Sequence, residues 1–325
     1  MDFSKNRFLK LANVECPIIG GPMYPCSNPE LVAAISEAGA LGVVQPLSLT
    51  FVYGYEFRAG LKYIRSLTKK PIGLNALIEA SSQKYLDRQK RFVDEALEEG
   101  VRFIITSLGN PRWVVERAKQ VGAVVFHDVT SPQWAKKAVD AGVDGLICVN
   151  ARAGGHAGSM TAGELFEDLS RLALPLVCAG GVGNAEEFRH MLELGYDAVQ
   201  MGTRFIATTE CKADERYKQA IVQASEKDIV LTKKITGVNV AVINTPYIQK
   251  MGTEPGPLVS YLLHHPRAKH WMRALYSVQA LFALKKVIRK PSVGDDYWQA
   301  GKSVEGIEEI KSAGEVIGDF MRSLR

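Results

Sequence analysis

A short pattern recurs along this chain: a helix-like segment ends, a glycine follows, and an apolar run begins. Glycine after the last helical turn is typical of the left-handed cap that ends a helix. The apolar runs are rich in Val and Ile and do not alternate with polar residues. This indicates strands that are buried on both faces, as in a parallel sheet. The glycines of the pattern are Gly39, Gly100, Gly122, Gly142 and Gly195.

Three further apolar runs begin at Pro17, Pro71 and Pro175, and proline is accepted as the first residue of a strand. Together these runs predict eight strands, each followed by a helix-like stretch. Eight βα units within about 200 residues predict an α/β fold, a closed (β/α)8 or TIM barrel. The rival is an open doubly wound sheet, which usually has fewer strands. The predicted helices span 29–39, 55–68, 83–99, 111–121, 131–141, 161–172 and 184–194.

The repeat fades after about Phe205, so we expect three parts. The barrel would span 1–208, an inserted and mostly helical subdomain on the substrate side would span 209–294, and 295–325 would return to the barrel as a C-terminal segment. The insertion contains a Pro/Gly-rich kink at 252–257 and a basic helix-like stretch from Trp271 to Lys290.

The composition excludes several classes of function. The net charge of +5 is spread along the chain without a block of like charges, so we expect no nucleic-acid partner. No apolar stretch of about 18 residues occurs, and the N-terminus lacks the apolar core of a signal peptide. We therefore expect a cytoplasmic protein with no membrane contact. The five cysteines form no CxxC pair, which argues against a disulfide framework and against a metal site.

Glycine-rich turns follow the seventh and eighth predicted strands, at the strand ends where barrel active sites lie. Loops at these two positions commonly bind a phosphate group. The first turn leads into a helix that begins with Asn184 as a cap and has Glu187 three residues on, and helix N-termini bind anions. The alternative is that the glycines only form tight turns. The residues predicted to hold the phosphate are Gly180, Gly181, Gly183, Gly202 and Thr203.

His156 lies in the loop after the sixth predicted strand, framed by small residues in ARAGGHAGSM. Small neighbours leave the imidazole open to a ligand, and histidine exchanges a proton near neutral pH. A lone histidine is otherwise more often a structural residue, but the position at the barrel rim favours a catalytic role. Asn75 and His127, at the ends of the third and fifth strands, are candidates for cofactor contacts, with structural hydrogen bonds as the alternative.

Five segments carry a resemblance to a known family: PIIGGPM, PIGLNAL, AGGHAG, CAGGVGNAEEF and AVQMGTRFIAT, in order over about residues 8–210. At these segments the chain resembles the nitronate monooxygenase family, formerly called 2-nitropropane dioxygenases. The same superfamily includes FMN-dependent enoyl-acyl carrier protein reductases and an NADH:quinone reductase. The likeness persists in outline through TGVNVAVINTPYIQKM and QAGKSVEGI.

The resemblance implies a (β/α)8 barrel that binds FMN non-covalently, with His156 as the catalytic group. Residues of the first and third strand ends and of the AGGH loop would contact the flavin ring or its ribityl chain, and the last two glycine turns would hold its phosphate. The residues that the resemblance assigns to the cofactor are Gly21, Pro22, Met23, Asn75, Ala153, Gly154, Gly180, Gly181, Gly202 and Thr203.

The resemblance also implies a reaction: oxidation of alkyl nitronates with O2, with His156 as a base or as the partner of the nitronate anion. The alternative is an NAD(P)H-dependent reductase of enoyl-acyl carrier protein thioesters or quinones. A purine-nucleotide dehydrogenase-like barrel would need a cysteine in the loop that carries His156, and a non-catalytic flavin-binding barrel would tolerate its loss. We expect a small-molecule substrate together with O2 or NAD(P)H, and a homodimer is left open.

Two residues depart from the family pattern. Asp128 follows His127 where relatives often have a basic or neutral residue, and a carboxylate near a flavin disfavours the anionic reduced ring. Lys302 stands in QAGKSVEG where relatives usually have Gln, and it would add positive charge near the site.

Overall fold

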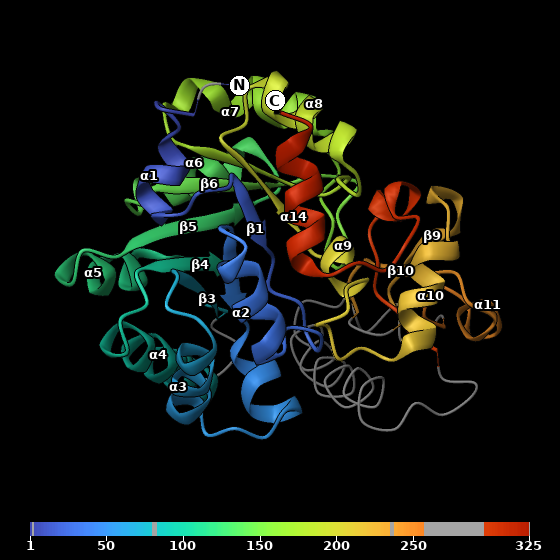
Figure 1. Cartoon of the computed structure of the whole chain (residues 1–325), viewed down its shortest axis with the longest axis horizontal. Coiled ribbons are helices and arrows are strands. Elements are labelled where there is room, and N and C mark those ends of the chain that lie inside the picture. The colour runs from blue at the N-terminus through green and yellow to red at the C-terminus, as the bar shows by residue number, and fades with distance from the viewer. Residues whose placement is uncertain (2, 80–82, 235–236, 257–295, 325) are drawn as a thin grey trace.

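The computed structural model of the chain describes all residues except 2, 80–82, 235–236, 257–295 and 325. Eight parallel strands close into a barrel in chain order, with the first strand paired to the eighth (Figure 1). This confirms the predicted (β/α)8 barrel. The strands are β1 (Ile18–Gly20), β2 (Leu41–Val44), β3 (Ile72–Leu77), β4 (Phe103–Ser107), β5 (Val124–Val129), β6 (Gly145–Val149), β7 (Leu176–Ala179) and β8 (Ala198–Met201).

A helix follows each of the first seven strands, close to the predicted ranges. The five glycines of the sequence pattern have positive φ angles, from 67° at Gly122 to 116° at Gly195, a conformation that glycine adopts without strain. The helix ends were therefore readable from the sequence. The helices are α2 (Pro29–Glu37), α3 (Phe57–Leu67), α4 (Gln83–Glu98), α5 (Arg112–Gln120), α6 (Pro132–Asp140), α7 (Ala162–Leu169) and α8 (Ala185–Leu194).

Side chains alternate along each strand between the barrel interior and the helix layer. The interior is filled by an apolar cluster that includes Leu41, Ile105, Phe126 and Ile147. At its amino end the barrel is closed by Phe8 of α1 (Arg7–Ala12), whose ring lies 6.2 Å edge-on from that of Phe126. The barrel interior is thus filled with side chains, so a ligand is expected at the carboxyl end of the barrel.

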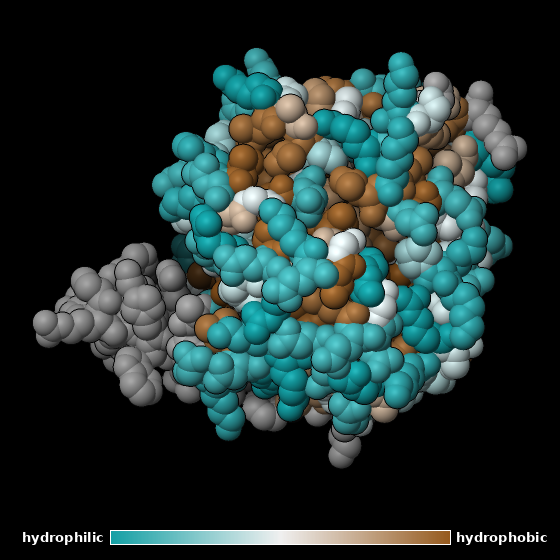
Figure 2. Space-filling view, turned by 90° about the vertical axis from the view of Figure 1, so that its left-hand side faces the viewer, coloured by the Kyte–Doolittle hydropathy of each residue, from teal (hydrophilic) through white to brown (hydrophobic). Residues whose placement is uncertain are grey.

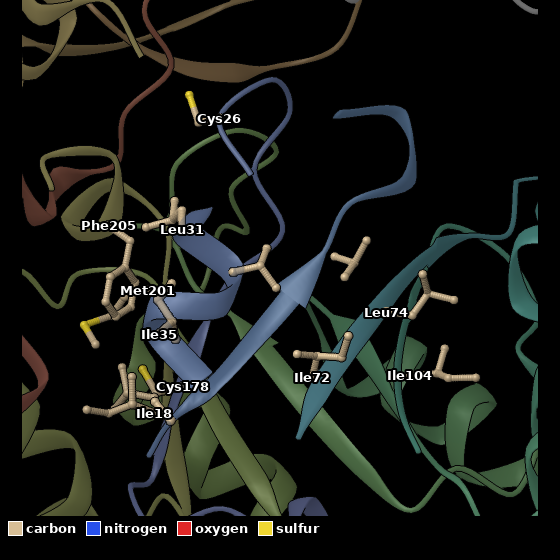
Figure 3. Close-up of a cluster of buried hydrophobic side chains, with 14 of the residues drawn as sticks. Ile18, Cys26, Leu31, Ile35, Ile72, Leu74, Ile104, Cys178, Met201 and Phe205 are labelled. Carbon is tan, nitrogen blue, oxygen red and sulfur yellow. The ribbon is translucent and has the colours of Figure 1, made fainter. Parts of the chain in front are cut away.

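The outward-facing strand residues form a second apolar cluster with the helices. Ile18 and Met201 of neighbouring strands lie with Ile35 of α2 and Phe205 of α9 (Thr203–Ile206) (Figure 3). Burial of such side chains stabilises each by about 1.5–3 kcal/mol relative to exposure. This cluster fixes the directions in which the strand ends present their loops.

The eighth barrel helix comes from the end of the chain. α14 (Ala313–Arg322) packs against both α8 and α2, between which the helix of the eighth unit belongs (Figure 1). The chain termini lie side by side, and the Met1 ammonium donates to the Leu324 carbonyl at 3.0 Å. α14 therefore completes the layer of helices around the barrel.

Between α9 and α14, the described residues include a two-stranded antiparallel sheet of β9 (Ile229–Thr232) and β10 (Val240–Ile243), which was not predicted from the sequence. The predicted basic helix from Trp271 to Lys290 lies outside the described residues, and the boundaries at 208 and 294 stay predictions. The described elements are α10 (Glu215–Gln223), η3 (Glu226–Asp228), β9 (Ile229–Thr232), β10 (Val240–Ile243), α11 (Pro246–Met251) and η4 (Lys302–Gly306).

Hydrophilic side chains cover much of the face drawn in Figure 2, with apolar atoms showing between them. Across the part of the chain that the structure describes, no helix is both long and apolar enough to span a membrane.

Candidate active site

Three polar side chains face the mouth of the barrel: Asn75 from β3, Asp128 from β5 and Gln200 from β8. Asp128 follows the interior residue Phe126 by two positions, and Gln200 follows the interior Ala198 in the same way. Asn75 likewise follows Gly73, which faces side chains of the interior cluster. The barrel mouth is therefore polar above an apolar floor.

One oxygen of each of these three side chains is buried without a hydrogen-bond partner in the described part of the chain. Asn75 Oδ1, Asp128 Oδ1 and Gln200 Oε1 account for three of the six such side-chain atoms found there. A buried unpaired polar group costs about 1–3 kcal/mol. Their concentration at one place indicates the position of a ligand with a polar edge. Asn75 was predicted from the sequence and Gln200 was not, although Gln200 gives the same signal as a polar residue in the apolar run AVQMG.

The alternation of β5 separates the two neighbours His127 and Asp128. His127 lies between Val125 and Val129, which belong to the outer cluster, so its side chain is directed to the helix layer. Its Nδ1 is 2.8 Å from the Thr106 hydroxyl oxygen, and only 6% of the residue is exposed. Burial lowers the pKa of His127 to about 4, which keeps the ring neutral. This placement favours the structural alternative for His127, and its predicted contact with a cofactor stays a prediction.

Asp128 has the opposite environment. Its side chain points into the barrel, and burial away from water raises the pKa of its carboxyl to about 7. A strongly shifted carboxyl in a barrel mouth is a recognised mark of a functional residue.

The loop after β6 carries His156 and is held by two other segments of the chain. Gly155 O accepts from the amide of Ala241 in β10 at 2.9 Å. Arg152 O accepts from the amide of Lys302 at 3.0 Å, so η4 also fixes the loop. Gly154 permits a close approach, because a Cβ on it would lie 2.9 Å from Gly301 N. β10 and η4 together therefore set the position of this loop.

His156 itself is accessible to solvent, as the small-residue frame predicted. The surrounding protein nevertheless desolvates its imidazole and lowers its pKa. A ring that is both accessible and desolvated suits a proton acceptor at neutral pH. Next to it, Ala153 is buried and its amide donates to Asn150 O at 3.2 Å.

The turns after β7 and β8 offer free backbone donors. The amides of Gly180, Gly181 and Gly202 donate to no residue that the structure describes. Gly180 has a φ of 115°, and a Cβ on it would lie 2.5 Å from Asn150 Oδ1, so the turn requires glycine. Thr203 is buried, and its hydroxyl oxygen accepts from Gly301 N at 3.0 Å.

Gly183 does not contribute a free amide, in contrast to the expectation from the sequence. Its N–H donates to Glu187 Oε2 at 2.7 Å, while Asn184 Oδ1 accepts from the Glu187 amide at 2.9 Å. The predicted cap at Asn184 is confirmed, but the carboxylate of Glu187 takes the place that an anion would need.

The loop after β1 lies beside the one after β8. The Gly21 amide donates to Met201 O at 2.8 Å, and a Cβ on Gly202 would lie 3.4 Å from Met23 Cγ. Met23 is fixed by Ser27, whose hydroxyl oxygen accepts from the Met23 amide at 2.8 Å. Pro22, half-buried, stands between Gly21 and Met23 on this loop. The first and last strand ends therefore form one continuous rim.

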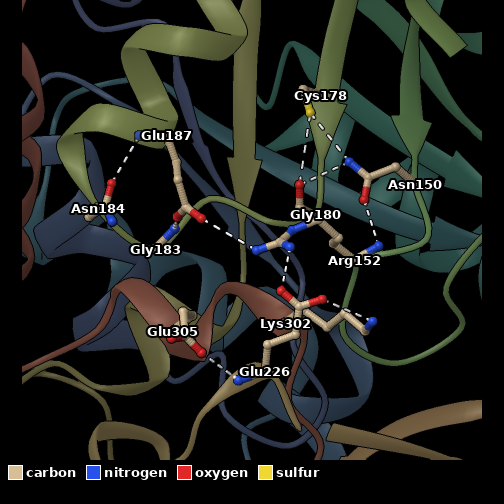
Figure 4. Close-up of polar contacts among 10 residues, drawn as sticks. All are labelled: Asn150, Arg152, Cys178, Gly180, Gly183, Asn184, Glu187, Glu226, Lys302 and Glu305. Carbon is tan, nitrogen blue, oxygen red and sulfur yellow. Dashed lines mark hydrogen bonds and ion pairs between the residues drawn. The ribbon is translucent and has the colours of Figure 1, made fainter. Parts of the chain in front are cut away.

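Charged side chains surround the glycine turn after β7 (Figure 4). Glu226 of η3 accepts from Arg152 Nη1 at 2.5 Å and from Lys302 Nζ at 3.0 Å. Arg152 also approaches Glu187 at 3.4 Å and lies over Gly181. The positive charge of Lys302 is thus compensated by the carboxylate of Glu226 in η3. Arg152 and Glu226 were not singled out from the sequence, because their pairing joins segments 74 residues apart.

The hydrogen-bonding groups of this site fit a flavin nucleotide. The free amides after β7 and β8 match a phosphate group, and the orphaned oxygens of Asn75, Asp128 and Gln200 match the polar edge of a ring. Among the described residues, no cluster of three or more His, Cys, Asp or Glu side chains could hold a metal ion.

The closed barrel, with free amides and unpaired side-chain oxygens at its mouth, defines a (β/α)8 barrel enzyme with its site at the carboxyl ends of the strands. The model of the nitronate monooxygenase family matches residues 5–322, so the chain belongs to this family and is an oxidoreductase. Curated relatives include a probable nitronate monooxygenase of Staphylococcus aureus strain JH9, 25% identical over 80% of this chain and 84% of the relative.

Other relatives carry different names. A (3aS,4S,5R,7aS)-5-hydroxy-7a-methyl-1-oxo-octahydro-1H-indene-4-carboxyl-CoA dehydrogenase of Rhodococcus jostii strain RHA1 is 26% identical, over 77% of this chain and 69% of its own. Among solved structures, FabK of Thermotoga maritima has a TM-score of 0.80 and 28% identity, covering 98% of this chain and 96% of that one. A nitroalkane oxidase of Streptomyces ansochromogenes, at 22% identity, TM-score 0.76 and 98% coverage of both chains, shares the fold.

Proposed function

We propose that this protein is an FMN-dependent nitronate monooxygenase that oxidises alkyl nitronates with O2. The observation that carries the proposal is His156, an accessible imidazole whose pKa is lowered by desolvation, in the loop after β6. A lowered pKa keeps the ring neutral near pH 7, so it can accept a proton. Membership of the nitronate monooxygenase family supports the same activity.

His156 would act first as a base. A free ring nitrogen would take the α-proton of a nitroalkane, which leaves the nitronate anion beside an imidazolium. Charge attraction and a charge-assisted hydrogen bond would then hold the anion in place. The bonds from Ala241 and Lys302 fix the loop before substrate binds, so little orientational freedom is lost on binding.

Bound FMN would supply the electron transfer that links the nitronate to O2. Backbone amides would bind its phosphate, with the Thr203 hydroxyl as a further donor because its proton is not used by Gly301. Side chains of the barrel mouth would hydrogen-bond its ring. The residues that we assign to the cofactor are Gly21, Pro22, Met23, Asn75, Ala153, Gly154, Gly180, Gly181, Gln200, Gly202 and Thr203.

A second candidate is an NAD(P)H-dependent reductase of enoyl thioesters or quinones on the same site. The likeness to FabK, an enoyl-acyl carrier protein reductase, favours it, because the 28% identity extends over 98% of the chain. The CoA thioester in the name of the Rhodococcus relative points to the same substrate class. The two candidates differ in what reduces the flavin.

The deciding experiment is an anaerobic titration of the purified, FMN-loaded protein, followed by its visible absorbance. We expect propyl-2-nitronate to bleach the flavin without NAD(P)H. Bleaching by NADH or NADPH but not by the nitronate would instead support the reductase. A protein that stays colourless with excess FMN would contradict both candidates.

The role of His156 is tested by His156→Ala, with His190→Ala on the exposed face of α8 as the matched control. We expect kcat/KM for a neutral nitroalkane to fall by about 10²–10⁴, the usual contribution of a general base. The loss should be smaller for the preformed nitronate, which has already lost its proton. Equal losses for both substrates would contradict the role as a base.

A further inference from the structure

The Asp128 carboxyl lies directly above the apolar side chains that fill the barrel interior. Along β5, Asp128 is the next inward-facing residue after Phe126, and it lies in register with Ile147 of β6. Phe126 and Ile147 both belong to the apolar cluster that fills the barrel interior. Its Oδ1 is buried and has no hydrogen-bond partner among the described residues. Nothing in the described part of the barrel therefore accounts for a polar side chain at this point, whereas a ligand in the mouth would.

No charged group of the described chain compensates Asp128. The flanking strand β4 carries no titratable side chain, and the titratable residue of β6 is the uncharged thiol of Cys148. On β5 itself, His127 is neutral and faces the helix layer. The loop after β6 carries two titratable groups, Arg152 and His156, and the lowered pKa of His156 keeps its ring uncharged.

Two cations of the adjoining segments are paired with a carboxylate other than Asp128. Arg152 and Lys302 both donate to Glu226 at the turn after β7 (Figure 4). Desolvation is the cause of the raised pKa of Asp128, about 7, so the carboxyl and carboxylate forms are similarly stable near neutral pH. A small change of charge in the mouth is then enough to shift this equilibrium.

We propose that Asp128 contacts the bound flavin and takes up one proton when the ring is reduced. The inference rests on FMN as the cofactor proposed above. Reduction delivers two electrons to the ring, and negative charge that remains there repels the carboxylate. The Asp128 carboxylate binds a proton from solvent and becomes a carboxyl, whose O–H donates to the ring. On reoxidation by O2 the carboxyl returns that proton to solvent, so charge and protons balance over the cycle.

The test is the reduction potential of the bound flavin between pH 5 and pH 9, measured by dye-coupled reduction. For a two-electron couple, each extra proton steepens the dependence by about 30 mV per pH unit. Above pH 7 we expect the wild-type protein to take up one more proton on reduction of the flavin than Asp128→Asn does. Below pH 6 both proteins should take up the same number. Asp144→Asn is the matched control, since Asp144 is a carboxylate beside the opposite end of β5, where its Oδ2 accepts from Val125 N at 2.8 Å.

A second measurement does not depend on Asp128→Asn. The reduced-minus-oxidised infrared difference spectrum of the wild type at pH 8 should contain a positive band of a protonated carboxyl, which Asp144→Asn retains. Absence of that band, or parallel potential lines for wild type and Asp128→Asn, would overturn the role of Asp128 while leaving FMN binding intact. Failure of the wild type to bind FMN would overturn the proposed function and this inference together.

Discussion

His127 and Asp128, neighbours on β5, should change the stability of the cofactor-free protein in opposite directions when the pH is lowered. The neutral form of His127 is favoured by the fold, since its pKa is lowered to about 4 from about 6.5 in an unfolded chain. Its contribution to stability is complete above pH 6.5 and is lost as the pH falls towards 4. The neutral form of Asp128 is also favoured, with a pKa raised from 3.8 to about 7. Its contribution is complete below pH 3.8 and is lost as the pH rises through 7.

The magnitude follows from proton linkage. Between pH 6.5 and pH 4.5, each group changes the free energy of unfolding by about 2 kcal/mol, because one pKa unit corresponds to about 1.36 kcal/mol. The two changes have opposite signs and nearly cancel in the wild type. For a chain of this length, 2 kcal/mol corresponds to a shift in Tm of about 3 °C.

The assay is thermal unfolding of FMN-free protein at several pH values in this window. Relative to the wild type, His127→Gln should gain about 3 °C on acidification, and Asp128→Asn should lose about 3 °C. The double variant should follow the wild type, and differences taken at each pH cancel the titration of all other groups. If Asp128→Asn tracks the wild type within about 1 °C throughout, then Asp128 is charged in the folded protein and the reasoning fails.

Three further outcomes can be measured on the same protein. Gly180→Ala should weaken FMN binding at least tenfold by equilibrium dialysis, because its Cβ would lie 2.5 Å from Asn150 Oδ1, whereas Gly163→Ala, with open space around it, should bind FMN normally. Glu226→Gln should lower stability by no more than about 1 kcal/mol, and less in high salt, since its partly exposed ion pairs are screened; a larger, salt-independent loss would contradict this. Cys178, whose pKa burial raises to about 12, should resist iodoacetamide in the native protein, as peptide mass spectrometry would show.

The sequence was sufficient to predict the barrel because its signals are local. A glycine such as Gly122 or Gly195 ends its own helix, and the apolar run after it is buried wherever the strand lies in the sheet. The same local character made Asn75 and His156 visible, one as a polar residue in an apolar run and the other by its frame of small residues.

The finer geometry of the site was beyond the sequence for a physical reason. A strand that is buried on both faces shows no alternation, so VVFHDV does not reveal that Asp128 faces inward and His127 outward. The loss of the Gly183 amide to Glu187 depends on one side-chain rotamer. The bond between Gly155 and Ala241 joins segments distant in the chain, and no short pattern predicts it.

The origin of the eighth barrel helix has a consequence for biosynthesis. α14 begins at Ala313, more than 110 residues after β8 ends at Met201, and it fills the groove between α2 and α8. At about 5–20 residues per second, a ribosome needs roughly 6–20 s to make the intervening chain. During that time the groove between α2 and α8 lacks the helix that fills it, and it can close only once α14 has been made. α14 is therefore part of the wall of the barrel, and removal of Ala313–Arg322 would leave the groove between α2 and α8 uncovered.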